Sequence, residues 1–312
     1  MKISIIIPTL NAEESLGEIL GTIQAGLEKN YEYEVIILDS ESNDNTVEIA
    51  KDMGAQVINI KRKEFNHGGT RNKAIDLSKG EFLVYLTQDA LPRDHRDIIS
   101  LIEPLVSNEN IGMAYGRQIP HENAKIFGSF ARLYNYGENS EIKSLKDKDK
   151  YGIKTIFCSN SFAVYRKSTL KEVGGFPTDI ILGEDTYVCA KMLLKGYEVA
   201  YSAEAIVRHS HDYNVIQEFK RNFDIGVFHT NEKWLKKEFS SAEGEGLKFV
   251  MNEMKYLIDN KKGYLLLLAV MRNGSKFIGY KLGTFERYIP LELKLKMSMY
   301  KSYWNRFAKQ SV

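Results

Sequence analysis

Cysteine is scarce in this chain, which has two cysteines among 312 residues. Cys158 and Cys189 do not form a Cys-x-x-Cys pair, so the sequence offers neither a zinc site nor a disulfide framework, and it favours a reducing compartment. Excess charge is also lacking, because the formal net charge is only +2. Proteins dedicated to nucleic acids usually carry a strong basic excess, so we expect no nucleic-acid partner.

Long hydrophobic runs are absent as well. No apolar stretch reaches the ~20 residues that span a bilayer. The best attempt, Tyr264–Met271, is closed by Arg272, and we expect it to be a buried helical segment. The apolar start of the chain is broken by Pro8, too early for a signal peptide. We therefore expect a cytoplasmic protein.

Two glycine-rich phosphate-binding motifs are missing too. The first predicted strand is not followed by Gly-x-Gly-x-x-Gly, which weakens a dinucleotide-redox interpretation. The Gly-x-x-x-x-Gly-Lys-[Ser/Thr] loop of P-loop nucleotidases is also absent.

What the sequence does contain is a regular alternation of short apolar runs and helical patterns. Runs this short and this apolar suit strands buried on both faces, as in a parallel sheet, and the alternation predicts a doubly wound α/β fold. The four runs are Ile3–Ile7, Val35–Leu38, Val57–Ile60 and Phe82–Leu86. The helices between them are predicted from residues that begin or end helices well, namely Asn11, Asn43 or Asp44, Gly54, Gly69 and Gly80.

Polar residues follow all four predicted strands. The carboxyl ends of the strands are where open α/β sheets bind ligands, and helix N-termini at the same edge favour anions such as phosphate. The sequence therefore predicts a nucleotide or phosphate crevice at this edge. The four polar sets are Pro8–Asn11, Asp39–Ser42, Lys61–Lys63 and Thr87–Asp89.

The C-terminal part has a different composition. Residues 264–312 hold nine Lys or Arg against two Glu, interleaved with aromatic and aliphatic residues. This composition is typical of a helix on an anionic membrane surface. A helical pair packed on the main domain, or on a second subunit, explains it equally well.

Five short motifs that occur in order along residues 1–230 resemble family 2 glycosyltransferases, which have the GT-A fold. They are Ile7–Asn11 (IPTLN), Leu38–Thr46 (LDSESNDNT), Gly68–Asn72 (GGTRN), Gln88–Ala90 (QDA) and Gly183–Thr186 (GEDT). A narrower likeness is to bacterial rhamnosyltransferases. It rests on Phe65–Asn72 (FNHGGTRN), Thr87–Pro92 (TQDALP), Tyr115–Pro120 (YGRQIP), His209–Tyr213 (HSHDY) and Phe219–His229 (FKRNFDIGVFH).

The resemblance implies a Rossmann-like, mostly parallel sheet flanked by helices over residues 1–230. The residue pattern itself predicts a helical extension over 231–312. It implies an inverting transfer from a nucleotide sugar, with dTDP-L-rhamnose as the expected donor. The expected acceptor is a polyprenyl-linked glycan, reached at the inner face of the membrane. A UDP-sugar donor stays open.

The family also implies a donor site. Asp39 is expected to accept a hydrogen bond from the base, and Arg71 to hold the diphosphate, with Gly68 and Gly69 allowing close approach. Asn11 has an alternative role as a helix cap, and Arg71 as a surface ion-pair partner. The whole expected donor set is Pro8, Thr9, Asn11, Glu13, Asp39, Ser40, Arg71, Asn72, Gln88 and Arg221.

A divalent cation, Mg²⁺ or Mn²⁺, is expected at Asp89, because a carboxylate that ends a buried strand is costly unless it is paired or binds a cation. Many relatives have Asp-x-Asp where this chain has Gln88-Asp89-Ala90, so one carboxylate remains. His209 and His211, two residues apart on one strand face, are further candidate ligands. The alternatives are a turn cap for Asp89 and structural roles for the two histidines.

Catalysis is expected from the acidic pair at the start of a predicted helix. Inversion needs a carboxylate that takes the acceptor proton, and we assign it to Asp185, with Glu184 as the alternative base or acceptor ligand. The helix dipole alone also explains two acids there. Two other classes stay open: a sugar-phosphate nucleotidylyltransferase, and a sugar-nucleotide sensor that would not need Asp185.

Overall fold

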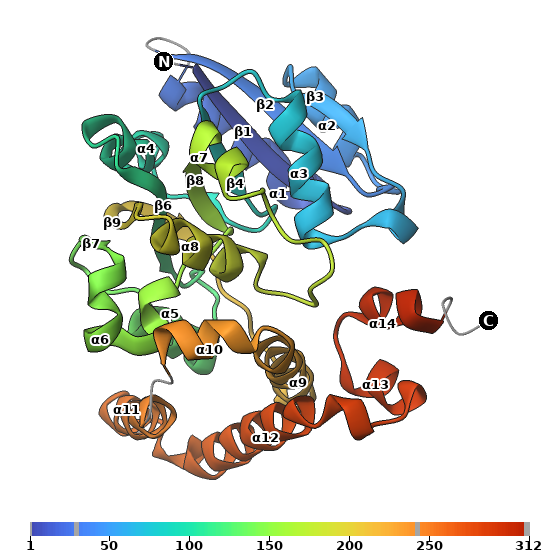
Figure 1. Ribbon diagram of the computed structural model, residues 1–312, viewed down its shortest axis with the longest axis vertical. Coiled ribbons are helices and arrows are strands. Elements are labelled where there is room, and N and C mark those ends of the chain that lie inside the picture. Colours follow the sequence, from blue (N-terminus) through green and yellow to red (C-terminus); the bar gives the residue numbers. More distant parts are fainter. Residues whose placement is uncertain (1, 28–30, 241–243, 309–312) are drawn as a thin grey trace.

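The computed structural model describes residues 2–27, 31–240 and 244–308, and their strands form one mixed sheet. The strand order is β3-β2-β1-β4-β8-β6-β9-β5, with β7 on β9 (Figure 1). Strands β3, β2, β1 and β4 run parallel, β8 is antiparallel to both β4 and β6, and β9 is parallel to β6. The strands are β1 (Lys2–Thr9), β2 (Glu32–Asp39), β3 (Gln56–Asn59), β4 (Phe82–Leu86), β5 (Leu91–Pro92), β6 (Ile111–Ile119), β7 (Glu141–Lys143), β8 (Phe162–Arg166) and β9 (Glu198–Arg208).

Helices cover both faces of this sheet and extend below it. The α-helices are α1 (Glu13–Leu27), α2 (Thr46–Asp52), α3 (His67–Leu77), α4 (Asp97–Ser107), α5 (Ile126–Asn135), α6 (Lys148–Tyr151), α7 (Lys167–Glu172), α8 (Glu184–Leu194), α9 (Val215–Asn231), α10 (Lys233–Phe239), α11 (Glu245–Asp259), α12 (Leu266–Thr284), α13 (Leu291–Met297) and α14 (Lys301–Ala308). Single 3-10 turns lie at Arg62–Glu64, Leu145–Asp147, Gly152–Ile156, Gly263–Leu265 and Glu286–Tyr288.

Alternation along the strands divides the core into two layers. In β1, Ile3, Ile5 and Ile7 pack with the buried side chains of α1 and α4, whereas Ile6 faces the layer that contains α3 and α8. Every residue of β4 is buried, as expected for a central strand covered on both faces. The predicted α/β sheet is therefore confirmed, and its polar strand ends lie at one edge.

The predicted element boundaries hold closely at the start of the chain. The run Phe82–Leu86 is a strand over those same residues, and the first three runs extend by a few residues or shift by one. Helix α3 begins at His67, earlier than predicted, because the Asn66 side chain caps it by accepting a hydrogen bond from the Gly69 N–H at 2.7 Å.

The C-terminal helices cross α9 at very short range. Gly226 on α9 and Gly279 and Gly283 on α12 lie where an added Cβ would collide with backbone atoms of the other helix. Only glycine permits this approach, so α9 and α12 are packed backbone to backbone.

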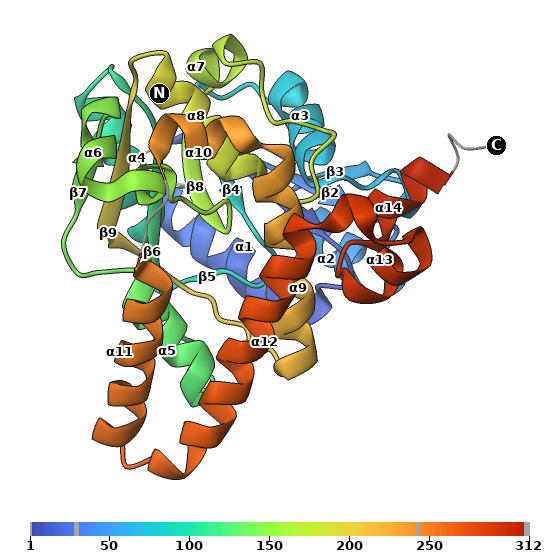
Figure 2. The same cartoon turned by 60° about the horizontal axis from the view of Figure 1, so that its bottom comes forward.

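Helices α11 and α12 form a hairpin that projects from the molecule beside α5 (Figure 2). The segment Tyr264–Met271 is helical over most of its length, as predicted, but the prediction that it is buried is wrong. Tyr264 and Leu267 are each 74% exposed, and Ala269 is its one fully buried side chain. Hydropathy shows that a segment is apolar and does not show what covers it. Among the described residues, the helices are all too short or too polar to cross a bilayer.

Candidate active site

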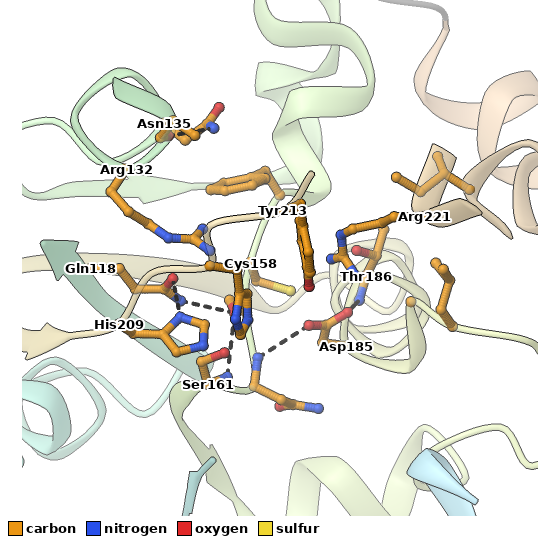
Figure 3. Close-up of a pocket in the computed structure, with 18 of the residues that line it drawn as sticks. Gln118, Arg132, Asn135, Cys158, Ser161, Asp185, Thr186, His209, Tyr213 and Arg221 are labelled. Atoms are coloured by element: carbon orange, nitrogen blue, oxygen red, sulfur yellow. Dashed lines mark hydrogen bonds between the residues drawn. The ribbon is translucent and has the colours of Figure 1, made fainter. Parts of the chain in front are cut away.

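A cavity of about 770 Å³ opens at the carboxyl edge of the sheet and continues between α5, α8, α9 and α12. Asp89, Asp185 and Arg221, which are far apart in the sequence, all line it. In Figure 3, Asp185 and Arg221 lie on one side of the Tyr213 ring, with Arg132, Gln118 and His209 on the other. The predicted crevice thus exists, and it extends from the strand ends to residues of α5, α8, α9 and α12 that the strand-end motifs did not indicate.

Asp89, His209 and His211 form a three-residue group that can hold a metal ion. One ligand atom from each residue lies within 4.8 Å of the others. The Asp89 Oδ2 is 3.5 Å from His209 Nε2 and 3.9 Å from His211 Nδ1. One carboxylate and two imidazoles leave coordination positions open for phosphate oxygens, so the donor chemistry fits a divalent cation.

The protonation states in this group also suit a metal. Burial alone would raise the pKa of Asp89, but the hydrogen bond and charge of His209 hold that pKa well below its usual range. Burial lowers the pKa of His209, and it lowers the pKa of His211 to about 4. At neutral pH the group is therefore an ionised carboxylate with two neutral imidazoles, the form in which these side chains bind metals.

Gln118 orients one of these imidazoles, and the sequence reasoning gave it no role. His209 Nδ1 lies 2.8 Å from Gln118 Oε1. The Gln118 amide is in turn fixed by donating to Ser159 Oγ at 3.0 Å. When Nδ1 carries the N–H and donates it to Gln118, the lone pair of Nε2 would be available to a metal, in place of the hydrogen bond that His209 otherwise makes to Asp89. Gln118 belongs to the YGRQIP motif, which supported the family resemblance without indicating this contact.

Asp185 has the properties of a general base. Its Oδ2 accepts from the Asn160 N–H at 3.1 Å, and its Oδ1 accepts from the Thr186 N–H at 2.7 Å. Burial, with the neighbouring charge of Glu184, raises the pKa of Asp185 to about 6. A carboxylate of this basicity is ionised at neutral pH and is a better proton acceptor than an ordinary aspartate.

Glu184, the alternative base, is committed to an ion pair. Its Oε1 is 3.0 Å from Arg71 Nη1, and both side chains are more than 90% buried. Asn160 Nδ2 donates to the same Glu184 oxygen at 3.2 Å. Burial would raise the pKa of Glu184, but Arg71 lowers it. The structure thus favours Asp185 over Glu184 as the base.

Arg71 lines the cavity, where it was predicted to hold the donor diphosphate. Its ion-pair partner is the buried Glu184 and not the expected surface partner, and its contact with the donor stays a prediction. The close approach allowed by Gly68 is to the backbone of Pro177, and Gly69 contacts the Asn66 cap. These two glycines therefore serve the packing of α3, and their close approach to a phosphate stays a prediction.

Two other arginines remain available to an anionic ligand. Arg132 on α5 and Arg221 on α9 line the cavity, and neither has a carboxylate within ion-pair distance among the described residues. Burial lowers the pKa of Arg132, and its Nε is buried without a hydrogen-bond partner. Arg221 was predicted from the sequence. Arg132 was not, because it lies in a helix that carries none of the motifs.

The strand-end residues predicted for the donor bond mainly to one another. Asp39 is 2% exposed, and its Oδ1 accepts from Thr9 Oγ1 at 3.0 Å. Its Oδ2 accepts from the Ser42 N–H at 3.0 Å. Asn11 has a φ of 53° and accepts from the Asn43 N–H at 2.9 Å, so it joins two loops and does not cap α1. This network fixes the edge of β1 against that of β2.

The other predicted donor residues at this edge differ in whether their polar atoms have hydrogen-bond partners within the protein. Glu13 accepts from the Asn45 N–H at 3.0 Å. Pro8 lies within β1 beside Leu38. Ser40 differs, because its Oγ is buried and has no hydrogen-bond partner in the described part of the chain.

Two predicted donor residues have structural roles instead. The Gln88 amide donates to the Leu10 carbonyl at 3.1 Å and accepts from the Leu10 N–H at 2.7 Å. The Asn72 amide makes the same double contact with the backbone of Phe176, at 2.7 and 2.8 Å. Both side chains are occupied by backbone partners, so the geometry does not support donor contacts for Gln88 and Asn72.

A second, open hollow of about 590 Å³ adjoins the ends of β2 and β3. It is lined by Glu41, Lys61, Arg62 and Lys63. Arg62 is held by donating from its Nη2 to the Glu41 carbonyl at 2.8 Å. The polar set after the third strand thus lies beside the loop of Asp39, as predicted.

Comparison with known proteins decides the family. The model of "Glycosyl transferase family 2" matches residues 4–174. The chain belongs to this family. It is 44% identical over 307 residues to the O-antigen chain rhamnosyltransferase RfbN of Salmonella typhimurium strain LT2, covering 98% of this chain and 96% of the relative. It is 43% identical to the O-antigen chain rhamnosyltransferase WbaN of Salmonella anatum, covering 97% and 95%.

Solved structures agree on the fold. A mannosyltransferase from Pyrobaculum calidifontis in complex with GDP-Man and Mn²⁺ superposes with a TM-score of 0.56 at 17% identity, covering 99% of this chain and 84% of that one. TarS residues 1–349 from S. aureus in complex with UDP-GlcNAc gives 0.54 at 15% identity, covering 92% and 91%. This family 2 member therefore has a GT-A fold and is a glycosyltransferase, which decides against the nucleotidylyltransferase and the sensor.

Proposed function

We propose that this protein transfers L-rhamnose from dTDP-L-rhamnose, with inversion, to a lipid-linked surface-polysaccharide acceptor. The observation that carries the proposal is that Asp185 and the Asp89–His209–His211 group line one cavity. The rhamnosyl specificity is supported by the two relatives that are named O-antigen chain rhamnosyltransferases and match nearly the whole chain.

In this reaction Asp185 removes the proton from the attacking acceptor hydroxyl. The new glycosidic bond forms at the anomeric carbon as the bond to the nucleoside diphosphate breaks on the opposite face, which inverts the configuration. Asp185 is held for this role by the backbone N–H groups of Asn160 and Thr186, and its raised pKa favours proton uptake.

The leaving diphosphate carries the charge that must be neutralised. A divalent cation held by Asp89, His209 and His211 would supply that charge when bound. Arg132 and Arg221 lie free of carboxylate partners among the described residues, and we assign both to the diphosphate oxygens. The imidazole ligands favour Mn²⁺ over Mg²⁺.

A screen of donor turnover tests this function. Purified protein is incubated with dTDP-L-rhamnose, other dTDP-sugars and UDP-sugars, each with Mg²⁺, Mn²⁺ or EDTA. We expect turnover of dTDP-L-rhamnose that EDTA abolishes. Preference for a UDP-sugar would show that the assigned donor is wrong and that the enzyme class is right. Full activity in EDTA would show that no metal is required.

The metal assignment has its own test. Asp89→Ala should weaken binding of dTDP in the presence of Mn²⁺, because the cation no longer links the protein to the phosphates. Thymidine, which has no phosphate, should bind the variant as well as wild type. Equal loss of both ligands would show that Asp89 serves the structure only.

We further infer that the α11–α12 hairpin rests on an anionic membrane, where a lipid-linked acceptor is found. Its exposed side chains combine apolar groups with a basic flank, the composition of interfacial helices. The exposed apolar residues on α11 and α12 and between them are Leu247, Met251, Ile258, Tyr264, Leu267, Leu268, Val270, Met271, Phe277, Ile278 and Leu282. The exposed basic residues are Lys248, Lys255, Lys261, Lys262 and Lys281. This refines the predicted tail, because α11 precedes residue 264.

Vesicle flotation tests the membrane contact. Binding to phosphatidylglycerol-containing vesicles should fall with added salt and should be weak on neutral vesicles, because each basic residue near an anionic surface contributes roughly 1 kcal/mol that salt screens. The variant Leu267→Glu/Val270→Glu should float less. A stable dimer by light scattering, with no vesicle binding, would assign the same surface to a second subunit.

A further inference from the structure

The chain returns to the cavity after α13, and the returning segment contributes a side chain to it. Tyr300, between α13 and α14, lines the same cavity as Asp185 and Arg221. Its ring contacts His67, at the start of α3, edge to face, with centroids 5.2 Å apart and an interplanar angle of 85°. A residue close to the C-terminus is thus part of the wall formed by the glycosyltransferase domain.

The position of Tyr300 is fixed by a buried carboxylate. Asp224 on α9 is completely buried, and its Oδ2 accepts from the Met299 N–H at 2.8 Å. The Tyr300 N–H donates to Ser298 Oγ at 2.9 Å. A buried carboxylate costs free energy unless its hydrogen bonds are satisfied, and Asp224 Oδ1 has no side-chain or backbone partner among the described residues. The contacts of Asp224 thus go to the strap just before Tyr300, namely to the Met299 N–H and to the side chain of Ser298.

The segment is also anchored beyond Tyr300. Trp304 is 3% exposed and lies beside Phe223 of α9, with ring centroids 6.4 Å apart. Arg306 Nη1 donates to the Thr178 carbonyl at 2.9 Å. The same carbonyl accepts from the Asn66 cap of α3 at 3.0 Å. Residues 298–306, which we name the C-terminal strap, therefore connect α9 to the start of α3 across the cavity.

Arg221 lines the same cavity as Tyr300. Its guanidinium is 5.9 Å from the ring of Tyr213, in a cation–π arrangement. Arg221 has no carboxylate partner among the described residues. Burial lowers the pKa of Arg221, but its tyrosine neighbours raise that pKa above its ordinary value.

We propose that Tyr300 is a donor-binding residue: the C-terminal strap places it in the wall of the cavity that Arg221 also lines, where it contacts the donor diphosphate and closes the cavity to water. This rests on the proposed function, in which Arg221 binds the diphosphate. Closure matters because a donor bound in an open site reacts with water instead of the acceptor.

Binding and turnover by variants of Tyr300 test the proposal. Tyr300→Phe keeps the ring and loses the hydroxyl, so dTDP in the presence of Mn²⁺ should bind about tenfold more weakly, while thymidine binds as in wild type. Tyr300→Ala should lose more dTDP affinity and should raise the ratio of donor hydrolysis to transfer. Tyr288→Ala is the matched control, because Tyr288 precedes the strap and is 85% exposed.

A second pair of variants tests the anchor without touching the cavity. Asp224→Asn keeps an oxygen that accepts from Met299, so it should resemble wild type. Asp224→Ala loses that acceptor and should reproduce the hydrolysis ratio of Tyr300→Ala. If Asp224→Ala does not fold, Met299→Pro removes the N–H donor, together with the Met299 side chain, and should have the same effect.

The outcomes separate this inference from the proposed function. If wild type does not turn over dTDP-L-rhamnose, the proposed function fails, and dTDP binding still reports on Tyr300. If wild type is active and Tyr300→Ala keeps its dTDP affinity and hydrolysis ratio, the strap has no role at the site. Equal weakening of dTDP and thymidine in Tyr300→Ala would also overturn the proposal, because it would indicate general loss of structure.

Discussion

The strand-end loops and the helices α5, α8 and α9 border the same site, but their polar side chains are in different states. At the strand ends, Asp39, Asn11 and Gln88 are bonded to other parts of the protein. On the helices, Asp185 has a raised pKa, and Arg132 and Arg221 lack carboxylate partners among the described residues. The comparison indicates that Asp39, Asn11 and Gln88 serve mainly as framework, whereas the helices bring Asp185, Arg132 and Arg221 into the cavity beside the Asp89–His209–His211 group.

The largest expected effect is on the helical side. Asp185→Asn removes the proton acceptor and should lower kcat by roughly 10²–10⁴-fold. The affinity for dTDP with Mn²⁺ should stay close to wild type, because Asn keeps the hydrogen bonds to Asn160 and Thr186 in part. Steady-state kinetics and calorimetry check both. Near-normal kcat would move the base to another residue.

The adjacent acid should behave in the opposite way. Glu184→Gln leaves the buried Arg71 guanidinium without its counter-charge, and breaking a buried ion pair costs about 3–5 kcal/mol of folding stability. Denaturant unfolding measures this cost. We expect Asp185→Asn to unfold near the wild-type midpoint, so the two variants separate stability from catalysis. A variant Glu184→Gln of wild-type stability would contradict the structural role.

The pH dependence should follow the pKa of Asp185. The protonated acid cannot take a proton, so kcat/KM should fall tenfold per pH unit below about pH 6 and level off above it. Asp89 stays ionised there, and the pKa of His211, about 4, lies below this range. Burial raises the pKa of Asp224 to about 7, so this group also titrates near the tested range. Asp224→Asn is therefore the control, and it should keep the fall of kcat/KM below about pH 6. A flat profile between pH 5 and 7 would exclude Asp185 as the base.

Arg132 tests whether an unpaired guanidinium binds the diphosphate. Arg132→Met should weaken dTDP by about tenfold and leave thymidine unchanged, since a charge-assisted contact to phosphate is lost. Arg117→Met is the matched control, because Arg117 pairs with the exposed Glu138 at 2.9 Å and does not line the cavity. An equal effect in both variants would point to net charge alone.

The smallest effect on activity should come from the strand ends. Gln88→Ala loses two hydrogen bonds to Leu10 and should lower the free energy of unfolding by about 1–2 kcal/mol. Its KM for the donor should stay near wild type. A large rise in KM, with stability unchanged, would return Gln88 to the donor site and weaken the contrast between the two regions.

The sequence predicted the sheet and its ligand edge because those signals are local. The apolar composition of a run such as Phe82–Leu86 indicates a buried strand, and the polar residues that follow it indicate where the strand ends. The acidic pair at Glu184 and Asp185, with the histidines at 209 and 211, was also found from short motifs. Their assembly in one cavity follows from the fold that those motifs indicated.

What the sequence did not predict depends on partners far along the chain. Arg71 meets Glu184, and Asn72 meets Phe176, each across more than a hundred residues. The sequence shows that Arg71 is a cation. Whether a phosphate or a carboxylate neutralises it depends on tertiary packing. Arg132 and Tyr300 lie outside the motifs, so no local signal distinguished them from ordinary surface residues.

The glycine crossing of α9 and α12 has a mechanical consequence. Because Gly226, Gly279 and Gly283 let the two backbones touch, α12 cannot tilt or slide without moving α9. Helix α9 carries Arg221 and Asp224. The α11–α12 hairpin and this side of the cavity therefore move together as one rigid unit. The distance of Arg221 from any surface on which the hairpin rests is then set by the dimensions of α9 and α12. The distance between the cavity and an acceptor in that surface would therefore be constant.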